Sequence, residues 1–343
     1  MTTRDIFLAE AATRILITDG AFGTEIQNWK LDEAAYAGTL GLTHDQKGNN
    51  DILALTKPEV PEAIHRAYFE AGADIAETNT FSANRISQAD YGAEHLVREI
   101  NVESAKLARR IADEFQAKDG RPRFVAGAIG PTNKTLSLSP DVNDPGYREI
   151  DFDYLKDVYR EQIDALVEGG ADFILIETVF DTLNAKAGIM ATIEAGEALG
   201  REIPIMLSMT LTDLSGHTVE AFWHAVRHAK PLTIGLNCSF GAEQLRPHVK
   251  TLSEICDTLI MIYPNAGLPN ELGAYDEAPV TTAGLVGEWA VEGQVNVLGG
   301  CCGSTPAHIK AIADKVKGMK PRTIPTPPVV TRLAGLEPFT MAA

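Results

Sequence analysis

Eight short runs of apolar, largely β-branched residues recur along the chain, and most are followed by a stretch with the hydrophobic spacing of an amphipathic helix. Nearly continuous apolar strands are typical of a parallel sheet that is covered on both faces. Eight strand-then-helix units predict an α/β fold, a (β/α)8 TIM barrel. A doubly wound open sheet is the alternative that the same pattern allows. The predicted strands are Ile15–Asp19, Ala73–Thr78, Phe124–Ile129, Phe173–Glu177, Ile205–Thr210, Thr233–Asn237, Leu259–Tyr263 and Val295–Leu298.

The helical stretches end or begin at recognisable signals. Ser304-Thr305-Pro306, for example, places a capping hydroxyl before a proline at an early helical position. A weak internal echo supports repeated units, because Gly72-Ala-Asp and Gly170-Ala-Asp both precede a strand that ends in Glu-Thr. The predicted helices are Pro61–Glu70, Leu96–Ala117, Asp153–Glu168, Leu183–Leu199, Val219–His228, Glu243–Cys256, Thr282–Val291 and Pro306–Val316.

Two connections are unusually long. Residues 27–58 join the first strand to its helix, and residues 130–151 follow the third strand. In a barrel both lie over the carboxyl ends of the strands, where long ordered loops are usually functional. We predict a barrel over residues 1–320 and a Pro-rich tail or linker over residues 321–343, since four prolines between 321 and 328 prevent a helix.

The chain is strongly acidic, with 30 Lys and Arg against 47 Asp and Glu, a net charge of −17. Such a charge repels phosphate backbones and anionic lipid surfaces, so we expect neither nucleic acid nor membrane as a partner. Solubility is the simplest use of the acidity. The amino terminus lacks the apolar core of a signal peptide, and no run of apolar residues is long enough to span a membrane, which predicts a cytoplasmic protein.

Four cysteines are too few for a disulfide framework, and three of them follow predicted strands. Cys238 follows the sixth strand, and the adjacent pair Cys301 and Cys302 follows the eighth. In a barrel all three lie on one rim, and three converging thiolates are typical of a zinc site with an open fourth position. Buried packing and a strained Cys301–Cys302 disulfide are the alternatives at this stage. Cys256, near a helix end, is predicted to pack in the core.

Zinc with three thiolate ligands carries a net charge near −1 and does not ionise water well. It lowers the pKa of a fourth thiol and leaves that sulfur electron-rich. This combination suits attack of a bound substrate thiolate on an electrophilic carbon such as a methyl group.

Carboxylates at strand ends are candidates to hold a substrate ammonium group. Asp19 ends the first predicted strand and Glu177 the fourth; Glu77 is a weaker candidate. Capping or structural ion pairs are the alternative roles. His224 and His228 lack the glutamate of a metalloprotease motif and are expected on a helix surface.

Several longer stretches point in the same direction. They are Asp19-Gly-Ala-Phe-Gly-Thr-Glu25, Glu77-Thr-Asn-Thr-Phe81, Ala89-Asp-Tyr-Gly92, Gly130-Pro-Thr-Asn133, Ser139-Pro-Asp-Val-Asn-Asp-Pro145, Glu177-Thr-Val-Phe-Asp-Thr182, Gly235-Leu-Asn-Cys238, Pro264-Asn-Ala-Gly-Leu-Pro269 and Gly299-Gly-Cys-Cys-Gly303. With them the chain resembles, from near residue 15 to its end, the N-terminal homocysteine-binding module of cobalamin-dependent methionine synthase. The cysteine pattern alone is similar to the wider homocysteine methyltransferase family, whereas the loop 139–145 and the turn 264–269 resemble the cobalamin-dependent branch.

The resemblance implies a (β/α)8 barrel with zinc on Cys238, Cys301 and Cys302. It also implies that Asp19 and Glu177 hold the homocysteine amino group, with backbone amides near Gly20 helping to place the substrate. Full-length members continue into folate-binding, cobalamin-binding and reactivation modules, whereas this chain stops just after residues 332–338, which resemble the junction into the folate module. We therefore expect a split enzyme or a piece of a longer one. We also expect methylcobalamin on a separate cobalamin-binding protein as methyl donor, and a separate folate-binding methyltransferase.

Two other functions remain open from the sequence. The same site can serve a small donor such as betaine or a sulfonium compound, which would favour an aromatic enclosure; the sequence does not place Trp29, Trp223 or Trp289 there. The other is a non-catalytic zinc-binding module, whose zinc would have four protein ligands.

Overall fold

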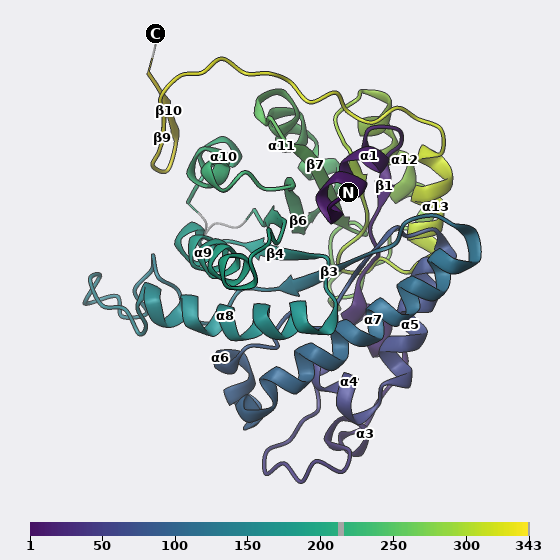
Figure 1. Cartoon of the computed structure of the whole chain (residues 1–343), viewed down its shortest axis with the longest axis vertical. Coiled ribbons are helices and arrows are strands. Elements are labelled where there is room, and N and C mark those ends of the chain that lie inside the picture. Colours follow the sequence, from purple (N-terminus) through teal and green to yellow (C-terminus); the bar gives the residue numbers. More distant parts are fainter. Residues whose placement is uncertain (212–215, 342–343) are drawn as a thin grey trace. The chain divides into compact units, whose positions relative to one another are not determined.

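The computed structural model describes residues 1–211 and 216–341, and the chain divides into two compact units. The first unit comprises Met1–Thr24, Tyr68–Ile75 and Ile205–Ala343, and the second comprises Glu25–Ala67 and Ala76–Pro204. Figure 1 colours the chain along its sequence, from purple at the amino terminus to yellow at the carboxyl terminus. Among the described residues, no helix has the length and apolar character needed to cross a membrane.

The eight predicted strands are all present and parallel. Their hydrogen-bonded order is β1-β8-β7-β6-β5-β4-β3-β2, and Thr18 after β1 forms a parallel bridge with Ile75 at the start of β2. That bridge returns the order to its beginning, so the fold is the predicted (β/α)8 barrel and the open doubly wound sheet is excluded. The strands are β1 (Leu16–Ile17), β2 (Ile75–Glu77), β3 (Phe124–Ile129), β4 (Phe173–Val179), β5 (Ile205–Met209), β6 (Thr233–Gly241), β7 (Leu259–Asn265) and β8 (Val297–Leu298).

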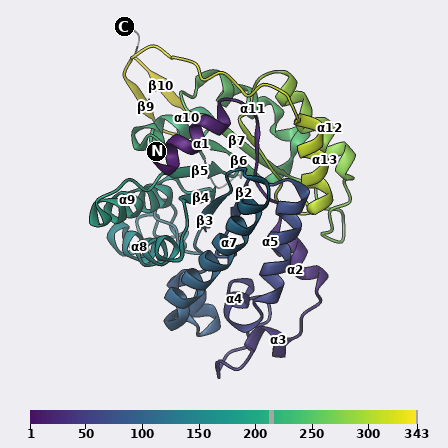
Figure 2. The same ribbon diagram turned by 45° about the vertical axis from the view of Figure 1, so that its right-hand side comes forward.

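In the first unit, α1 (Thr3–Ala11) precedes β1, and helices follow β5 to β8. The helix that the Ser-Thr-Pro signal predicts is confirmed at both ends. Figure 2 shows the last two helices next to each other, in contact along their length. A hairpin of β9 (Arg332–Ala334) and β10 (Pro338–Thr340) packs against the first of the four helices. These helices are α10 (Val219–Val226), α11 (Ala242–Ile255), α12 (Pro279–Val291) and α13 (Pro306–Val316).

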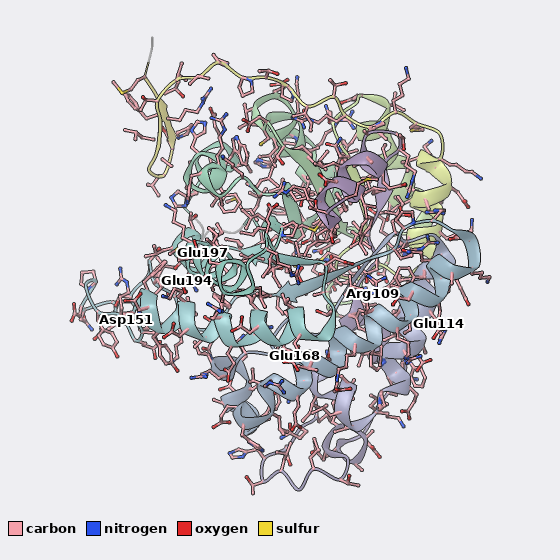
Figure 3. All side chains as sticks on the ribbon, in the orientation of Figure 1. Arg109, Glu114, Asp151, Glu168, Glu194 and Glu197 are labelled. Carbon is pink, nitrogen blue, oxygen red and sulfur yellow. The ribbon has the colours of Figure 1, made fainter. Side chains whose placement is uncertain are left out.

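In the second unit, three long helices α7, α8 and α9 lie in succession, each in contact with the next. Figure 3 labels charged side chains of these helices, among them Arg109 of α7, Glu168 of α8 and Glu194 of α9. The helices of this unit are α3 (Glu33–Ala37), α4 (Leu53–Thr56), α6 (Arg85–Gln88), α7 (Val97–Asp119), α8 (Phe152–Gly169) and α9 (Thr182–Leu199). Two more, α2 (Phe22–Asn28) and α5 (Glu59–Ala71), contain residues of both units.

The repeated Gly-Ala-Asp pattern in the sequence corresponds to a repeated set of hydrogen bonds in the structure. In the first unit, the Asp74 carboxylate accepts hydrogen bonds from the Ile17 amide at 3.0 Å and from both terminal nitrogens of Arg14. In the second unit, Asp172 accepts in the same way from the Val125 amide at 2.8 Å and from Arg109 at 2.7 Å. In each case a carboxylate just before one strand accepts a hydrogen bond from the second residue of the strand before it.

The connection 27–58 was expected to be a loop, but it contains α3 and α4. Asp32 caps α3, and the Glu33 carboxylate accepts hydrogen bonds from the Gln46 and Lys47 amides, so the segment folds back on itself. Its end is held by Asn49 and Gln88, whose buried side-chain amides bond to each other. The other long connection, 130–151, forms neither helix nor strand, as predicted.

Arg322 anchors the chain where it leaves α13. Its guanidinium is buried and donates to three backbone carbonyls, those of Ser253 at 2.9 Å, Thr258 at 2.8 Å and Cys256 at 2.5 Å. These carbonyls lie at and just beyond the carboxyl end of α11, where the helix dipole favours a positive charge. The Pro-rich segment therefore begins from a fixed point. The predicted domain boundary at residue 320 stays a prediction.

We predict that Arg322→Ala lowers the free energy of unfolding by about 2–4 kcal/mol, because three backbone carbonyls lose their charged donor. Urea unfolding followed by circular dichroism measures the change. Arg98→Ala, which removes only an exposed pair with Glu168, is the control and is expected to cost less than about 1 kcal/mol. Equal losses in the two variants would contradict the anchoring role.

Asp51, just before α4, is a buried carboxyl whose oxygen accepts a hydrogen bond from the Ser82 amide at 3.0 Å. Burial raises its pKa to about 7. Because the folded-state pKa lies above the unfolded value, the stability this group contributes is fully present below about pH 4 and is lost as the pH rises through about 7.

We therefore predict that Asp51→Asn flattens the pH dependence of stability. Between pH 5.5 and pH 8 the native chain should lose about 2 kcal/mol from this group, and the variant should not. Urea midpoints at the two pH values test this, with the exposed Asp45→Asn as control. An unchanged pH dependence in Asp51→Asn would rule the assignment out.

Candidate metal centre and substrate site

The three cysteines singled out from the sequence lie together in the first unit. The sulfurs of Cys238, Cys301 and Cys302 are all within 4.8 Å of one another, and the Cys238 and Cys302 sulfurs are 3.9 Å apart. All three side chains are half-buried. Within residues 1–211 and 216–341, this is the one group of three or more metal-ligating side chains whose ligand atoms converge in this way.

Strand pairing and two loop hydrogen bonds bring the sulfurs together. β7 lies between β6 and β8 and pairs with both. Beyond the last paired residues, the Cys301 amide donates to the Pro264 carbonyl at 2.7 Å, and the Ala266 amide donates to the Cys302 carbonyl at 2.9 Å. The segment after β8 is thereby fixed to the end of β7, one strand away from Cys238.

The backbone at Cys238 leaves the regular strand conformation. Cys238 and Ser239 both have φ near +60°, a region that residues other than glycine adopt rarely and at a cost of about 1–3 kcal/mol each. The pairing register between β6 and β7 shifts between Asn237 and Gly241. The Ser239 hydroxyl bonds to that of Thr210 at 2.7 Å, which helps to hold the distorted segment.

Gly303 allows a tight approach beside the cysteine pair. Its φ is +80°, and a Cβ added there would lie 2.2 Å from the Cβ of Tyr275. Gly299 is equally confined, since an added Cβ would meet the Thr18 side chain at 2.2 Å. A side chain at either position would therefore collide with a neighbouring residue, which is why glycine is needed at both.

The three cysteine side chains shift one another's pKa values, and Cys302 is the one whose negative charge is favoured. Hydrogen bonds from Cys238 and Cys301 lower the pKa of Cys302 to about 3, with the Tyr275 side chain contributing in the same direction. The pKa of Cys301 is raised, first by its hydrogen bond with Cys238 and also by burial. Burial and the nearby Cys302 charge raise the pKa of Tyr275 to about 12, so its phenol stays protonated.

The sulfur geometry suits zinc. Tetrahedral coordination with zinc–sulfur bonds of about 2.3 Å separates two ligand sulfurs by about 3.8 Å, close to the observed 3.9 Å between Cys238 and Cys302. Asn265, at the end of β7, adds a buried side-chain oxygen for which the described residues supply no hydrogen-bond partner. It lies between Pro264 and Ala266, which hold the cysteine segment.

Asp19 follows β1 in the same unit and is buried. Its carbonyl accepts a hydrogen bond from the Gly300 amide at 3.2 Å, so it lies beside the segment that leads to Cys301. Gly20 is packed so closely that an added Cβ would lie 2.8 Å from the Tyr68 ring. Of the amides near Gly20, that of Ala21 already donates to the Ser304 hydroxyl at 3.2 Å.

Glu177 belongs to the second unit. It is buried in β4, two residues before the strand ends, and lines a pocket with Tyr159 and Asp181. The next residue, Thr178, has φ of +54°, so the strained backbone marks the end of this strand too. Glu77 ends β2 and is half-buried.

Of the other predictions about cysteine, tryptophan and histidine residues, some are confirmed and one is corrected. Cys256 is fully buried, as expected for core packing. Trp223 and Trp289 are buried in α10 and α12, and Trp29 is exposed after α2. His228 is exposed, but His224 is not a surface residue: it is half-buried, and burial lowers its pKa, because the hairpin β9–β10 packs against α10.

Sequence reasoning missed three residues of this site, namely Asn237, Asn265 and Tyr275. Asn237 directly precedes Cys238, and its side-chain nitrogen donates to the Cys301 sulfur at 3.9 Å. An available signal was that Asn237 ends the predicted strand 233–237 and that Asn265 ends β7. Tyr275 stands in the loop before α12, and no sequence pattern marks it.

The fold and the three sulfurs define a barrel protein whose converging cysteines could hold a metal ion. The chain belongs to the homocysteine S-methyltransferase family, whose model matches residues 16–316. It is therefore a methyltransferase, as the cysteine pattern predicted.

Solved structures of one relative share the fold. The metallated form of the homocysteine methyltransferase MmuM from Escherichia coli is 22% identical, with 90% of this chain and 98% of that chain covered and a TM-score of 0.69. Its oxidized form is 23% identical, with coverages of 88% and 96% and a TM-score of 0.68. Its apo form has the same identity and coverages, with a TM-score of 0.63.

We predict that Gly303→Ala reduces the zinc content of the purified protein and lowers its stability by more than the left-handed backbone penalty of about 1–2 kcal/mol, because the new methyl group collides with Tyr275. Metal analysis and thermal unfolding measure both. Gly318→Ala is the matched control: its φ is +78°, but nothing lies within 4 Å of the added Cβ. The same zinc loss in both variants would refute the steric explanation.

Proposed function

We propose that this protein makes methionine by methylating the sulfur of homocysteine, with zinc held by Cys238, Cys301 and Cys302. The observation that carries the proposal is the convergence of three half-buried sulfurs within 4.8 Å at the ends of β6 and β8. The family supports homocysteine as the methyl acceptor, and the metallated form of MmuM supports a metal in the site.

Zinc bound to three thiolates lowers the pKa of an arriving thiol while leaving its sulfur nucleophilic. Among the described residues, Cys238, Cys301 and Cys302 are the one group of three or more candidate ligands whose ligand atoms converge. A fourth position on the ion would therefore be open to the substrate sulfur.

The substrate's amino group requires anionic partners. We assign this role to Asp19, beside the cysteine segment, and to Glu177 in β4, with backbone amides near Gly20 assisting. Buried carboxylates hold an ammonium group firmly because little water competes for it. The substrate sulfur then attacks the methyl carbon in line, and the donor leaves with the electron pair of the broken bond. Orientation supplies much of the acceleration in such a reaction.

For the donor, we propose methylcobalamin carried by a separate protein, with a separate folate-binding methyltransferase recharging it. The support is the resemblance of the 139–145 loop and the 264–269 turn to the cobalamin-dependent branch. Val142, at the middle of that loop, is 93% exposed and available to a partner. Trp223 and Trp289, both buried, do not supply the aromatic enclosure that a small cationic donor favours. A cytoplasmic location stays a prediction.

Methionine formation by the zinc-loaded protein, assayed with methylcobalamin, betaine and S-methylmethionine separately, tests the donor. Activity with methylcobalamin alone supports the proposal, and activity with a small donor alone contradicts it. X-ray absorption at the zinc edge, with and without homocysteine, tests the acceptor. Unchanged coordination would indicate a closed, purely structural zinc.

We predict that Cys302→Ala abolishes methionine formation and lowers zinc content, because two sulfurs cannot hold the ion in the same way. Cys256→Ala is the matched control: it removes a buried cysteine that lies outside the trio and should keep its zinc despite some loss of stability. Full activity of Cys302→Ala would show the assignment to be wrong.

A further inference from the structure

The proposed chemistry places several sulfurs around one ion, yet only the sulfur of the substrate should accept the methyl group. Methylation of a cysteine ligand would convert a thiolate into a thioether, a neutral and weaker ligand. In that step the cysteine sulfur forms a bond to the methyl carbon, and the donor departs with its electron pair. The site therefore needs a feature that makes its own thiolates poorer nucleophiles than the substrate.

A buried side-chain relay reaches one of the ligands. The Ser208 hydroxyl in β5 donates to the Asn237 side-chain oxygen in β6 at 2.6 Å, and the Asn237 side-chain nitrogen donates to the Cys301 sulfur at 3.9 Å. Ser208 and Asn237 are both inaccessible to solvent. Because a hydroxyl donates to the amide oxygen, the amide is oriented with its N–H groups toward the sulfur.

We propose that Ser208 and Asn237 are positioning residues that direct methylation to the substrate sulfur by hydrogen-bonding the Cys301 thiolate. A donated hydrogen bond withdraws electron density from a thiolate and stabilises its negative charge. Cys301 then stays a good ligand and a poor nucleophile. This inference rests on the proposed function for its biological meaning, but the relay itself is a property of the first unit alone.

The residue types suit this task. An aspartate at 237 would present an anion to the thiolate, and a leucine would present no donor. Ser208 adds the second constraint, since without its hydroxyl the amide can turn its oxygen toward the sulfur. Side chains that orient metal ligands in this way typically contribute 10- to 100-fold to metal affinity.

The test uses the full chain loaded with zinc and treated with methyl iodide, a small methyl donor that needs no partner protein. Peptide mass spectrometry then locates the methylated cysteine, and competition with a chromogenic chelator gives the zinc affinity. We expect Asn237→Leu to raise the methylation rate of Cys301 about tenfold and to weaken zinc binding by a similar factor. Ser208→Ala, which leaves Asn237 in place, should change both in the same direction by less.

Thr192→Val is the matched control. Thr192 is also buried, and its hydroxyl donates to the Gly188 carbonyl within α9 at 2.8 Å rather than to a group of the cysteine site. It should leave the methylation of Cys301 unchanged. Wild-type reactivity of Cys301 in Asn237→Leu and Ser208→Ala would overturn the relay, and so would an equal rise in Thr192→Val.

The two proposals fail in different ways. A wild-type protein that binds zinc and shows the relay pattern but forms no methionine from any donor contradicts the proposed function and leaves the relay intact. Methionine formation by the wild-type protein, together with relay variants that behave as wild type, contradicts the relay and leaves the proposed function intact.

Discussion

Two backbone hydrogen bonds between the ends of β7 and β8 are the constraint on which the site depends. The Cys301 amide bonds to Pro264, and the Ala266 amide bonds to Cys302. In an extended strand, adjacent side chains point to opposite faces, so two neighbouring cysteines cannot face one ion. β8 ends at Leu298, and the loop beyond it, fixed to β7, gives both sulfurs the same direction. Cys238 reaches them only because its own backbone departs from the strand.

The sequence predicted the architecture because alternation of apolar strands and amphipathic helices reflects burial on a barrel directly. The helix 306–316 and the placement of Cys301 and Cys302 after strand eight follow from the same reasoning, whereas β6 runs beyond its predicted end and contains Cys238. Short elements could not be predicted from this alternation. α3 depends on the bonds that Glu33 makes to residues 46 and 47, and the hairpin β9–β10 depends on packing against α10. Such tertiary contacts leave little trace in local periodicity.

The polar residues around the sulfurs show the same limit. A cysteine can be recognised as a candidate metal ligand from its residue type, because few residues ligate soft metals. The roles of Asn237 and Tyr275 depend only on the direction in which their side chains point. Asn237 could serve as a strand-end cap as easily as a donor to sulfur. Only the pairing of β5 with β6, which brings the Ser208 hydroxyl within 2.6 Å of the Asn237 side-chain oxygen, distinguishes the two roles.

The pairing of the first strand with the last has a consequence for biosynthesis. β8 has only two residues, and both pair with β1, while Gly300 bonds to Asp19. Residues 16 and 17 must therefore meet residues 297 and 298, about 280 positions later in the chain, before the cysteine pair is in place. A nascent chain on the ribosome cannot make this pairing until β8 has emerged, so metal loading belongs to the time after β8 is made and paired with β1.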